Sequence, residues 1–475
     1  MSPRESIHDA IRSDESADTG AQFLGLAARY FESTRAGEGQ VSTPLTPAAI
    51  AERFAGPLPE EGISIEEIVA RLERDVVSDA NKLCHPMYMG HQVCAPLPAA
   101  VWTESVIGAL NQSIAIFEMS PTGTMIEHQV IRWMCGLVGY PAGSGGTLTS
   151  GGTEATFTAL LAARNAALPD AWDDGVGPEG GYVIYGEHAH YAVTRAIGQL
   201  GLGRKRGIPI RSKDYRMDVS HLSEKLARLG SERKKIIAVV ATAGSTATGS
   251  FDDLPAIADL CDEHGVWLHV DGAHGASGLL SRNPPPVVDA LKRARSLAWD
   301  PHKMMLLPLS AGMLLVRDER DLEQAFSQQA PYLFKTADGE RNPDQGFRSF
   351  QCSRRADVLK LWVALHRYGS RGMGELYDGL CERARELHAM IAARPEFETI
   401  HEPESNILCF RSKGSDELNR LLRPSFNKNG SGWITSTVLD GRPVLRVTIM
   451  NPRTATEHLA KLLDGLAAEA SKLGG

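Results

Sequence analysis

Two neighbouring segments decide the fold: Val266-Trp-Leu-His-Val-Asp271-Gly-Ala-His-Gly and, further along, Ser296-Leu-Ala-Trp-Asp-Pro-His-Lys303. Each begins with a short apolar run, which predicts a buried strand, and continues into small and polar residues. A helical stretch lies between them, so together they predict one strand–helix–strand step of a mostly parallel sheet. Ligands of such sheets bind where the strands reach their carboxyl ends. We therefore expect Asp271 and Lys303 to face the same crevice.

The same alternation extends outward, from about residue 90 to residue 316. Apolar and β-branched runs predict strands at residues 181–185, 236–241, 266–270, 296–299 and 312–316. Periodic apolar residues predict helices at residues 154–168, 191–201, 218–229, 254–264 and 287–294. Alternating strands and helices indicate an α/β fold, in which helices flank both faces of a mostly parallel central sheet.

The chain has 475 residues, which is long for a single core, and its pattern changes twice. We expect an N-terminal helical segment at residues 1–80, a large α/β domain at 81–354 and a small C-terminal α+β domain at 355–475. N-terminal helices are predicted at 21–33 and 64–80, on either side of a Pro/Gly-rich stretch at 44–62. The C-terminal part has helical runs at 355–368, 373–394 and 455–473 and strand-like runs at 407–411, 433–438 and 444–449.

The composition excludes several classes of protein. The formal net charge is −8, so the surface offers nucleic acid or anionic lipid no general attraction. Seven dispersed cysteines without a CxxC pair argue against a disulfide framework or a zinc site and favour a reducing compartment. Residues 1–19 are polar, and no run of about 18 apolar residues occurs, so we expect neither a signal peptide nor a membrane span. These features predict a cytoplasmic enzyme that acts on a small molecule.

Lys303 is the strongest candidate for chemistry. Desolvation disfavours the cationic form of a lysine, which makes its amine available as a nucleophile for Schiff bases. Asp271, at the end of its strand, needs a partner if it is buried, and the protonated ring nitrogen of a cofactor would serve. Each residue alone also has a plainer interpretation: a lysine of a surface loop, and an aspartate that caps a helix.

A third segment, Thr149-Ser-Gly-Gly-Thr153, opens a strongly helical run. Free N–H groups and the helix dipole at such a start attract anions, and a phosphate is the natural guest. The segment is neither a Walker motif nor a GxGxxG motif. An ordinary glycine-rich helix cap is the alternative interpretation.

Two histidines, His188 and His190, follow the strand predicted at 181–185. An imidazole there could stack on an aromatic ring, bind a metal or cap a helix. Together with His269 they could suggest a metal site, but no further ligand follows at a suitable spacing, so we expect no metal. A Ser–His–Asp hydrolase is also disfavoured, because no GxSxG elbow surrounds Ser150 or Ser245.

The order of these features resembles the pyridoxal-phosphate (PLP) enzymes of fold type I, the aspartate-aminotransferase fold. In detail, residues of about 80–460 resemble the group II amino-acid decarboxylases. The segments that carry the resemblance are His85-Pro86 with Gly90-His91, Ala109-Leu110-Asn111-Gln112, Ser120-Pro121 with Glu127, residues 149–155, His190-Tyr191, residues 240–246 with 249–252, residues 269–273 and Asp300-Pro-His-Lys303.

The resemblance implies a role for individual residues. Lys303 forms the Schiff base with PLP, Asp271 pairs with the pyridine nitrogen, and His190 stacks on the ring and takes part in proton delivery. Thr242 and Ala273 make further contacts with the ring. The residues expected around the phosphate are Gly151, Gly152, Thr153, Asp300 and His302. A carboxylate repels a phosphate, so Asp300 is expected to turn to a neighbouring N–H or hydroxyl group. His274 receives no role.

The resemblance also implies a reaction: an L-amino acid loses CO₂ and leaves as the amine. Tyr332, in Gln329-Ala-Pro-Tyr332-Leu-Phe-Lys, matches the loop tyrosine that returns a proton to the α-carbon in this family. The polar stretch at 334–346 fits a flap that excludes water. Another PLP reaction on the same scaffold, that of a transaminase, an aldehyde synthase or a lyase, is the main alternative. A non-catalytic binding protein is the third.

Enzymes of this fold place their sites at a subunit interface, so the resemblance implies a homodimer. Candidates for contact with the substrate are His91, Gln92 and Phe117. These side chains are neither clearly cationic nor clearly apolar. Aromatic, acidic and diamino acids therefore all stay open as substrates.

Overall fold

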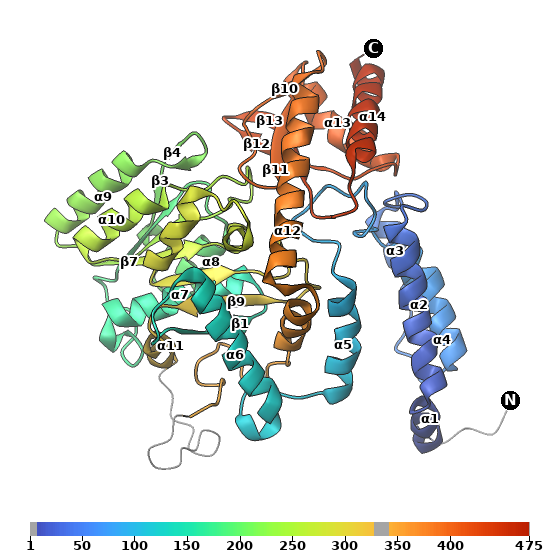
Figure 1. Cartoon of the computed structure of the whole chain (residues 1–475), viewed down its shortest axis with the longest axis horizontal. Coiled ribbons are helices and arrows are strands. Elements are labelled where there is room, and N and C mark those ends of the chain that lie inside the picture. The colour runs from blue at the N-terminus through green and yellow to red at the C-terminus, as the bar shows by residue number, and fades with distance from the viewer. Residues whose placement is uncertain (1–6, 327–341, 475) are drawn as a thin grey trace. The chain divides into compact units, whose positions relative to one another are not determined.

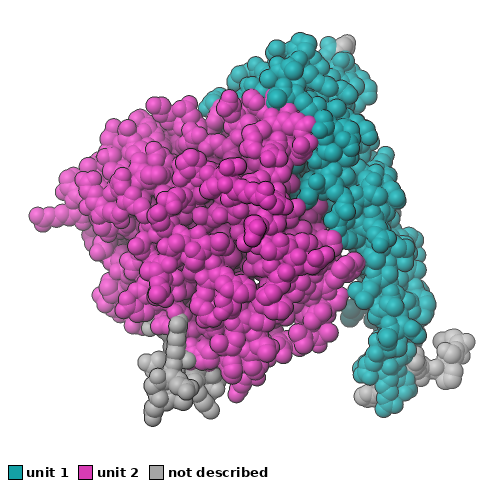
Figure 2. All heavy atoms as spheres, in the orientation of Figure 1, with its two compact units in different colours: residues 1–91, 389–400, 410–475 teal, residues 92–388, 401–409 magenta. Residues whose placement is uncertain are grey.

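The computed structural model describes residues 7–326 and 342–474. The chain separates into two compact units, which Figure 2 colours differently. The small unit comprises Met1–His91, Ala389–Ile400 and Phe410–Gly475, and the large unit comprises Gln92–His388 and His401–Cys409. The three-part division at residues 80 and 354 stays a prediction. No helix in the described residues has the length and apolar character needed to cross a membrane.

A seven-stranded sheet forms the centre of the large unit, with the strand order β1-β9-β8-β7-β6-β2-β3. β6, β7 and β8 run parallel to one another, as do β2, β3 and β6, and only β9 pairs antiparallel with its neighbours β1 and β8. The sheet is therefore mostly parallel, as predicted. The strands are β1 (Gly145–Thr149), β2 (Tyr182–Gly186), β3 (Gly207–Ile210), β6 (Ile236–Thr242), β7 (Trp267–Asp271), β8 (Ser296–Trp299) and β9 (Gly312–Val316).

Helices cover both faces of this sheet, as the burial of its strands shows. Every residue of β7, β8 and β9 is buried, although successive side chains point to opposite faces. One core cluster joins Leu160 and Leu161 of α7 (Gly152–Ala167) to Val193 and Ile197 of α8 (Ala192–Gln199) and to Val240 of β6. Figure 1 shows these helices packed around the sheet.

The other elements of the large unit are α5 (Pro98–Leu110), α6 (Pro121–Val138), β4 (Ser212–Lys213), β5 (Arg216–Met217), α9 (Val219–Ser231), α10 (Leu254–His264) and α11 (Arg320–Ala325). Two elements, α12 (Val358–Ala392) and β11 (Ile407–Ser412), span the boundary between the units. The two helices predicted at 355–368 and 373–394 are the two parts of α12. They meet at Gly369, whose φ of +68° interrupts the helical geometry.

The small unit combines N-terminal helices with a four-stranded sheet of order β10-β11-β13-β12, to which β11 contributes across the boundary. Its elements are α1 (Ile7–Asp14), α2 (Ala17–Arg35), α3 (Pro47–Arg53), α4 (Ile65–Arg71), β10 (Phe397–Thr399), α13 (Asp416–Lys428), β12 (Thr435–Leu439), β13 (Arg442–Thr448) and α14 (Thr456–Gly474). The Pro/Gly-rich stretch at 44–62 contains α3, which Thr46 caps with its hydroxyl and Pro47 begins. The short helix α3 was not predicted.

The structure corrects the sequence-based elements of the large unit at several places. The helix predicted at 287–294 is a 3-10 helix at Pro286–Arg293. β1 was not predicted, because its first two residues are glycines, which disfavour strands. The close pairing requires one of them, since a Cβ on Gly146 would collide with the carbonyl oxygen of Leu314 in β9. β3, α5 and α6 also lie outside the predicted elements.

Candidate active site

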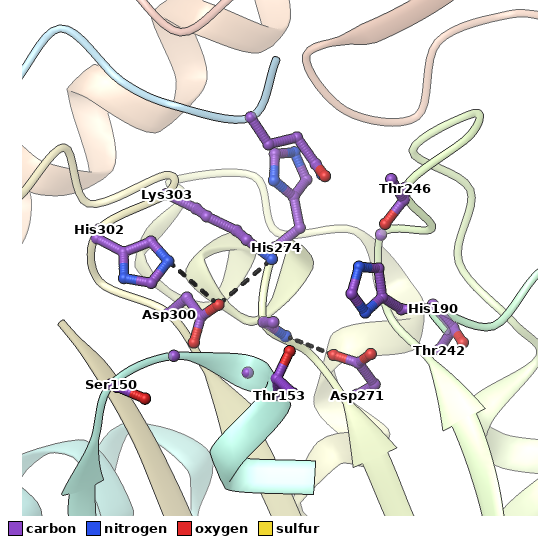
Figure 3. Close-up of a pocket in the computed structure, with 15 residues that line it drawn as sticks. Ser150, Thr153, His190, Thr242, Thr246, Asp271, His274, Asp300, His302 and Lys303 are labelled. Atoms are coloured by element: carbon purple, nitrogen blue, oxygen red, sulfur yellow. Dashed lines mark hydrogen bonds and ion pairs between the residues drawn. The ribbon is translucent and has the colours of Figure 1, made fainter. Parts of the chain in front are cut away.

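A cavity of about 370 Å³ opens at the carboxyl ends of β6, β7 and β8, beside the first turn of α7 (Figure 3). Its lining comes from segments that lie far apart in the sequence. The described lining residues are Gln92, Ser150, Gly151, Gly152, Thr153, His190, Thr242, Gly244, Thr246, Asp271, Ala273, His274, Asp300, His302 and Lys303. The structure thus brings together all ten residues that the resemblance assigns to the cofactor.

The glycine-rich turn leaves the start of α7 open to a guest. α7 begins at Gly152, so the first N–H groups of the helix have no carbonyl partner within it. A Cβ on Gly152 would lie 2.9 Å from the Cβ of Ala273 and 3.1 Å from Oδ2 of Asp300. Ser150 turns away from this opening, because its hydroxyl donates to Oε2 of Glu154 at 2.7 Å. The open turn is suited to an anion such as a phosphate.

Lys303 lies in a turn that follows β8, together with Asp300 and His302. Its Nζ is 3.3 Å from Oδ2 of Asp300, and Nε2 of His302 is 3.4 Å from the same oxygen. Nδ1 of His302 accepts the backbone N–H of Ala311 at 3.0 Å, so Nε2 carries the proton of the neutral ring. Figure 3 shows both side chains directed at Asp300.

Asp271 ends β7 with its side chain at the cavity. Its Oδ1 accepts the N–H of Ala273 at 3.2 Å. His269, two residues earlier, is on the same side of β7 but lies in the interior, where Nδ1 is 2.9 Å from Oγ of Ser296. Burial lowers the pKa of His269 to about 4, although Asp271 opposes this shift. The uncharged His269 therefore leaves the charge of Asp271 available to a ligand.

His190 follows β2, and a backbone N–H group two residues further along the chain holds its ring. Its Nδ1 accepts the N–H of Ala192 at 3.2 Å, which leaves the proton of the neutral ring on Nε2. Burial lowers the pKa of His190 below its ordinary value, and the Asp271 carboxylate opposes that shift. His190 is therefore neutral at pH 7, with a flat ring in the cavity wall. His188, its neighbour, binds Ser212 through Nε2 at 3.1 Å.

A buried carboxylate fixes the end of β6. Asp252 accepts the backbone N–H of Thr242 and of Met217, each at 2.7 Å. Burial raises the pKa of Asp252 to about 6, and the two N–H donors limit the rise. Thr242 is thus held in place in the cavity wall.

Apart from Ser150, which belongs to the predicted anion-binding segment, three lining residues received no role from the sequence: Gly244, Thr246 and His274. Gly244 and Thr246 lie just past β6, so the rule that ligands sit beyond the carboxyl ends of strands could have identified them. His274 was noticed only as a neighbour of the matched segment. Its Nε2 lies 2.6 Å from Oδ1 of Asn406, a contact between residues distant in sequence that no local pattern reveals.

The predicted substrate residues have different positions. Gln92 lines the cavity, whereas Phe117 begins a 3-10 helix at Phe117–Met119 and is not among the described lining residues. His91 belongs to the small unit. Tyr332 and most of the predicted flap lie outside the described residues. Among the described residues, no group of three or more His, Cys, Asp and Glu side chains could hold a metal ion.

The lining fits PLP in its donor and acceptor groups. The amine of Lys303 suits the aldehyde of PLP, the carboxylate of Asp271 suits its ring nitrogen, and the open start of α7 suits its phosphate. All three groups line one cavity. Nε2 of Gln92 and Oδ1 of Asp300 are buried and lack a hydrogen-bond partner among the described residues. Buried polar atoms of this kind indicate a polar guest.

Proteins of known function that resemble this chain agree with a PLP site in this cavity. Residues 49–413 match the family model described as the pyridoxal-dependent decarboxylase conserved domain. The L-2,4-diaminobutyrate decarboxylase of Rhizobium meliloti is 34% identical over 88% of this chain and 84% of its own length. Mouse cysteine sulfinic acid decarboxylase is 32% identical over 74% of this chain and 72% of its own.

A solved structure shows the same architecture. It is the glutamate decarboxylase domain of diaminobutyrate-pyruvate transaminase and L-2,4-diaminobutyrate decarboxylase from Vibrio parahaemolyticus, with a TM-score of 0.86. The likeness covers 96% of this chain and 95% of that chain, at 26% identity. The chain therefore belongs to the pyridoxal-dependent decarboxylase family. It is a PLP-dependent amino-acid decarboxylase of fold type I.

Proposed function

We propose that this decarboxylase acts on L-2,4-diaminobutyrate, a short diamino acid, and releases it as 1,3-diaminopropane and CO₂. The polar lining of the cavity carries the proposal: Gln92, Thr246 and His274 offer nitrogen and oxygen atoms to a polar side chain. Two relatives named L-2,4-diaminobutyrate decarboxylase, from Rhizobium meliloti and Acinetobacter baumannii, match 88% and 87% of this chain and support it further.

The residues of the cavity divide the work among them. PLP, when bound, supplies an electron sink for the bond that breaks at the α-carbon. Lys303 would hold the cofactor through Nζ, and Asp271 would pair with its ring nitrogen. The start of α7, with Thr153 and His302, would bind the phosphate, and His190, Ala273 and Thr242 would contact the ring.

Return of a proton to the α-carbon is proposed for Tyr332, on the resemblance alone. The neutral His190 presents Nε2–H to the cavity and is proposed to relay that proton. Tyr332→Phe should divert turnover toward an aldehyde, with oxygen consumed. Loss of CO₂ release without aldehyde would argue against this role.

A substrate panel tests the proposed function. The holoenzyme is offered L-2,4-diaminobutyrate, L-ornithine, L-lysine, L-glutamate, L-aspartate, L-cysteine sulfinate, L-tryptophan and L-dopa, with amines and CO₂ measured. We expect the largest kcat/KM with L-2,4-diaminobutyrate and none with its D-isomer. A preference for an aromatic or acidic amino acid would refute the substrate. A keto acid, or an aldehyde with hydrogen peroxide in place of the amine, would refute the reaction.

We also propose a homodimer. Large apolar side chains of α5 and α6 are exposed in the large unit, namely Trp102, Val106, Leu110, Met125, Trp133 and Leu137. Such a concentration of exposed apolar side chains is typical of a protein interface. Light scattering should give twice the 51.4 kDa of the chain, and Val106→Glu should lower that mass. A monomer with full activity would exclude the dimer.

The proposed location is the cytoplasm. None of the seven cysteines, all of which lie in the described residues, forms a disulfide, and Cys352 is exposed. Free thiols persist in a reducing compartment. Labelling of all seven thiols in protein unfolded directly from cell extract would support this location, and a disulfide would contradict it.

A further inference from the structure

Asp300 places a negative charge in the part of the cavity that suits an anion. It follows β8 and is 2% exposed. Its carboxylate lies beside Gly152, the first residue of α7, whose backbone N–H helps to lower the pKa of Asp300. A phosphate bound at the start of α7 would also need backbone N–H donors, and its negative charge would repel the Asp300 carboxylate. A buried carboxylate at this position lowers the stability of the protein unless its charge interacts with another group.

Lys303 is the group that can form an ion pair with the Asp300 carboxylate. Its Nζ lies 3.3 Å from Oδ2 of Asp300, closer than Nε2 of His302 at 3.4 Å. Burial alone would raise the pKa of Asp300, but Lys303 and His302 outweigh it and hold that pKa below the ordinary value. Asp300 is therefore ionised at neutral pH, and its carboxylate lies at ion-pair distance from Nζ of Lys303.

We propose that Asp300 is a positioning residue that keeps a proton on Nζ of Lys303, both before and after Lys303 is linked to the cofactor. The inference rests on the proposed function, since it takes Lys303 as the lysine that holds PLP. A protonated carbon–nitrogen double bond is more electrophilic than a neutral one. A carboxylate that keeps this proton in place therefore prepares the linkage for attack by the amine of the substrate. The proton stays on Nζ, and no other bond changes.

The remaining charges of the cavity are consistent with this assignment. Lys303 is the only lysine or arginine among the described lining residues, which include two carboxylates, Asp271 and Asp300. Asp271 is assigned to the ring nitrogen, so Asp300 is left for Lys303. The other titratable groups that face the cavity are His190, His274 and His302. Burial lowers the pKa of His190, so that ring adds no charge at neutral pH.

The test compares wild type with Asp300→Asn, which retains an oxygen acceptor for Gly152 and loses the charge. The holoenzyme is titrated with base while the visible absorbance of the Lys303 linkage is recorded. We expect the midpoint of the Asn variant to fall by about one to three pH units. Asp300→Glu retains the charge and should stay nearer to wild type. An unchanged midpoint in Asp300→Asn would overturn the proposal.

A second measurement does not depend on the cofactor. The apoprotein is labelled with an amine-reactive reagent at a series of pH values, and the peptide that contains Lys303 is quantified by mass spectrometry. Lys303 of Asp300→Asn should react at lower pH than that of wild type, by a similar shift. Equal labelling curves would overturn the proposal. If circular dichroism shows that Asp300→Asn does not fold, Asp300→Ser takes its place in both measurements.

These outcomes separate this proposal from the proposed function. A holoenzyme without a visible band, or with its reduced adduct on another lysine, would refute the role of Lys303 itself. A normal band that titrates identically in wild type and Asp300→Asn would refute only the role of Asp300. A changed affinity for PLP with an unchanged midpoint would make Asp300 a ligand of the phosphate and would also overturn the proposal.

Discussion

The guanidinium of Arg354 binds both carboxylate oxygens of Glu127, at 2.6 and 2.8 Å, in the interior of the large unit. Burial opposes the charge of Arg354, but the Glu127 carboxylate raises its pKa above the ordinary value. Oε1 of Glu127 also accepts the N–H of Leu148 at 3.3 Å. Leu148 lies in β1, directly before the glycine-rich turn. The ion pair therefore anchors the strand that leads into the cavity.

Breaking this pair should destabilise the protein strongly. Arg354→Met leaves a buried carboxylate without its partner, and we expect a loss of about 3–5 kcal/mol in the free energy of unfolding by urea. The double variant Glu127→Leu/Arg354→Met should recover much of that loss, because no charge stays buried. Arg355→Met is the control, since Arg355 pairs with Glu104 near the surface, and it should cost less than about 1 kcal/mol. Equal losses in Arg354→Met and Arg355→Met would contradict this account.

The open turn at the start of α7 predicts a steric effect on cofactor binding. Gly152→Ala places a methyl group 2.9 Å from the Cβ of Ala273 and 3.1 Å from Asp300, so one of them must move. We expect the dissociation constant of PLP to rise about tenfold or more, measured by titration of the apoprotein. Gly143→Ala is the matched control, because a Cβ there meets no atom within 4 Å. If both variants bind PLP equally well, the phosphate lies elsewhere.

Lys303 should carry the colour of the enzyme. Wild type should absorb at the edge of the visible range, and borohydride should bleach the band and leave an adduct on the peptide that contains Lys303. Lys303→Ala should lose band, adduct and turnover but still bind PLP weakly, through the start of α7 and Asp271. Lys292→Ala, at a surface lysine paired with Asp289, should behave like wild type. An adduct on any other lysine would refute the assignment.

We expect the buried His269 to make the protein less stable in acid. Its pKa is lowered from 6.5 to about 4 in the folded protein, chiefly by burial. Between these values the unfolded chain binds a proton that the folded chain does not, so stability falls as the pH drops from 6.5 toward 4. The contribution is about 3 kcal/mol. His269→Gln should unfold in urea with a shallower pH dependence across this window, whereas His264→Gln should match wild type.

The sequence predicted the α/β fold and five of the seven strands of the central sheet, for an identifiable reason. β8 and β9 were predicted with their observed bounds because they are short apolar runs beside clear turn residues. Asp271 and Lys303 line the same cavity because parallel strands end at one edge of the sheet. These features follow from local patterns together with one topological rule.

What the sequence did not predict depends on contacts between distant segments. β1 requires glycine to pack against β9, although glycine alone argues against a strand. The contact of His274 with Asn406, and the pairing of Glu127 with Arg354, join residues that no periodic pattern connects. The antiparallel direction of β9 likewise appears only when its partners are known. Such features are properties of the assembled sheet.

The position of β9 has a consequence for the order of events during synthesis. β9 lies between β8 and β1, so the strand that leads to the glycine-rich turn gains its neighbour only after Gly312–Val316 has been made. A shorter nascent chain can contain every described lining residue, of which Lys303 is the last, but not the strand that pairs with β1. We therefore expect stable loading with PLP to follow translation of this region. A ligand at 100 times its dissociation constant adds about 2.7 kcal/mol to the folded state alone. Cells short of vitamin B6 should therefore degrade newly made chains faster than cells with an ample supply.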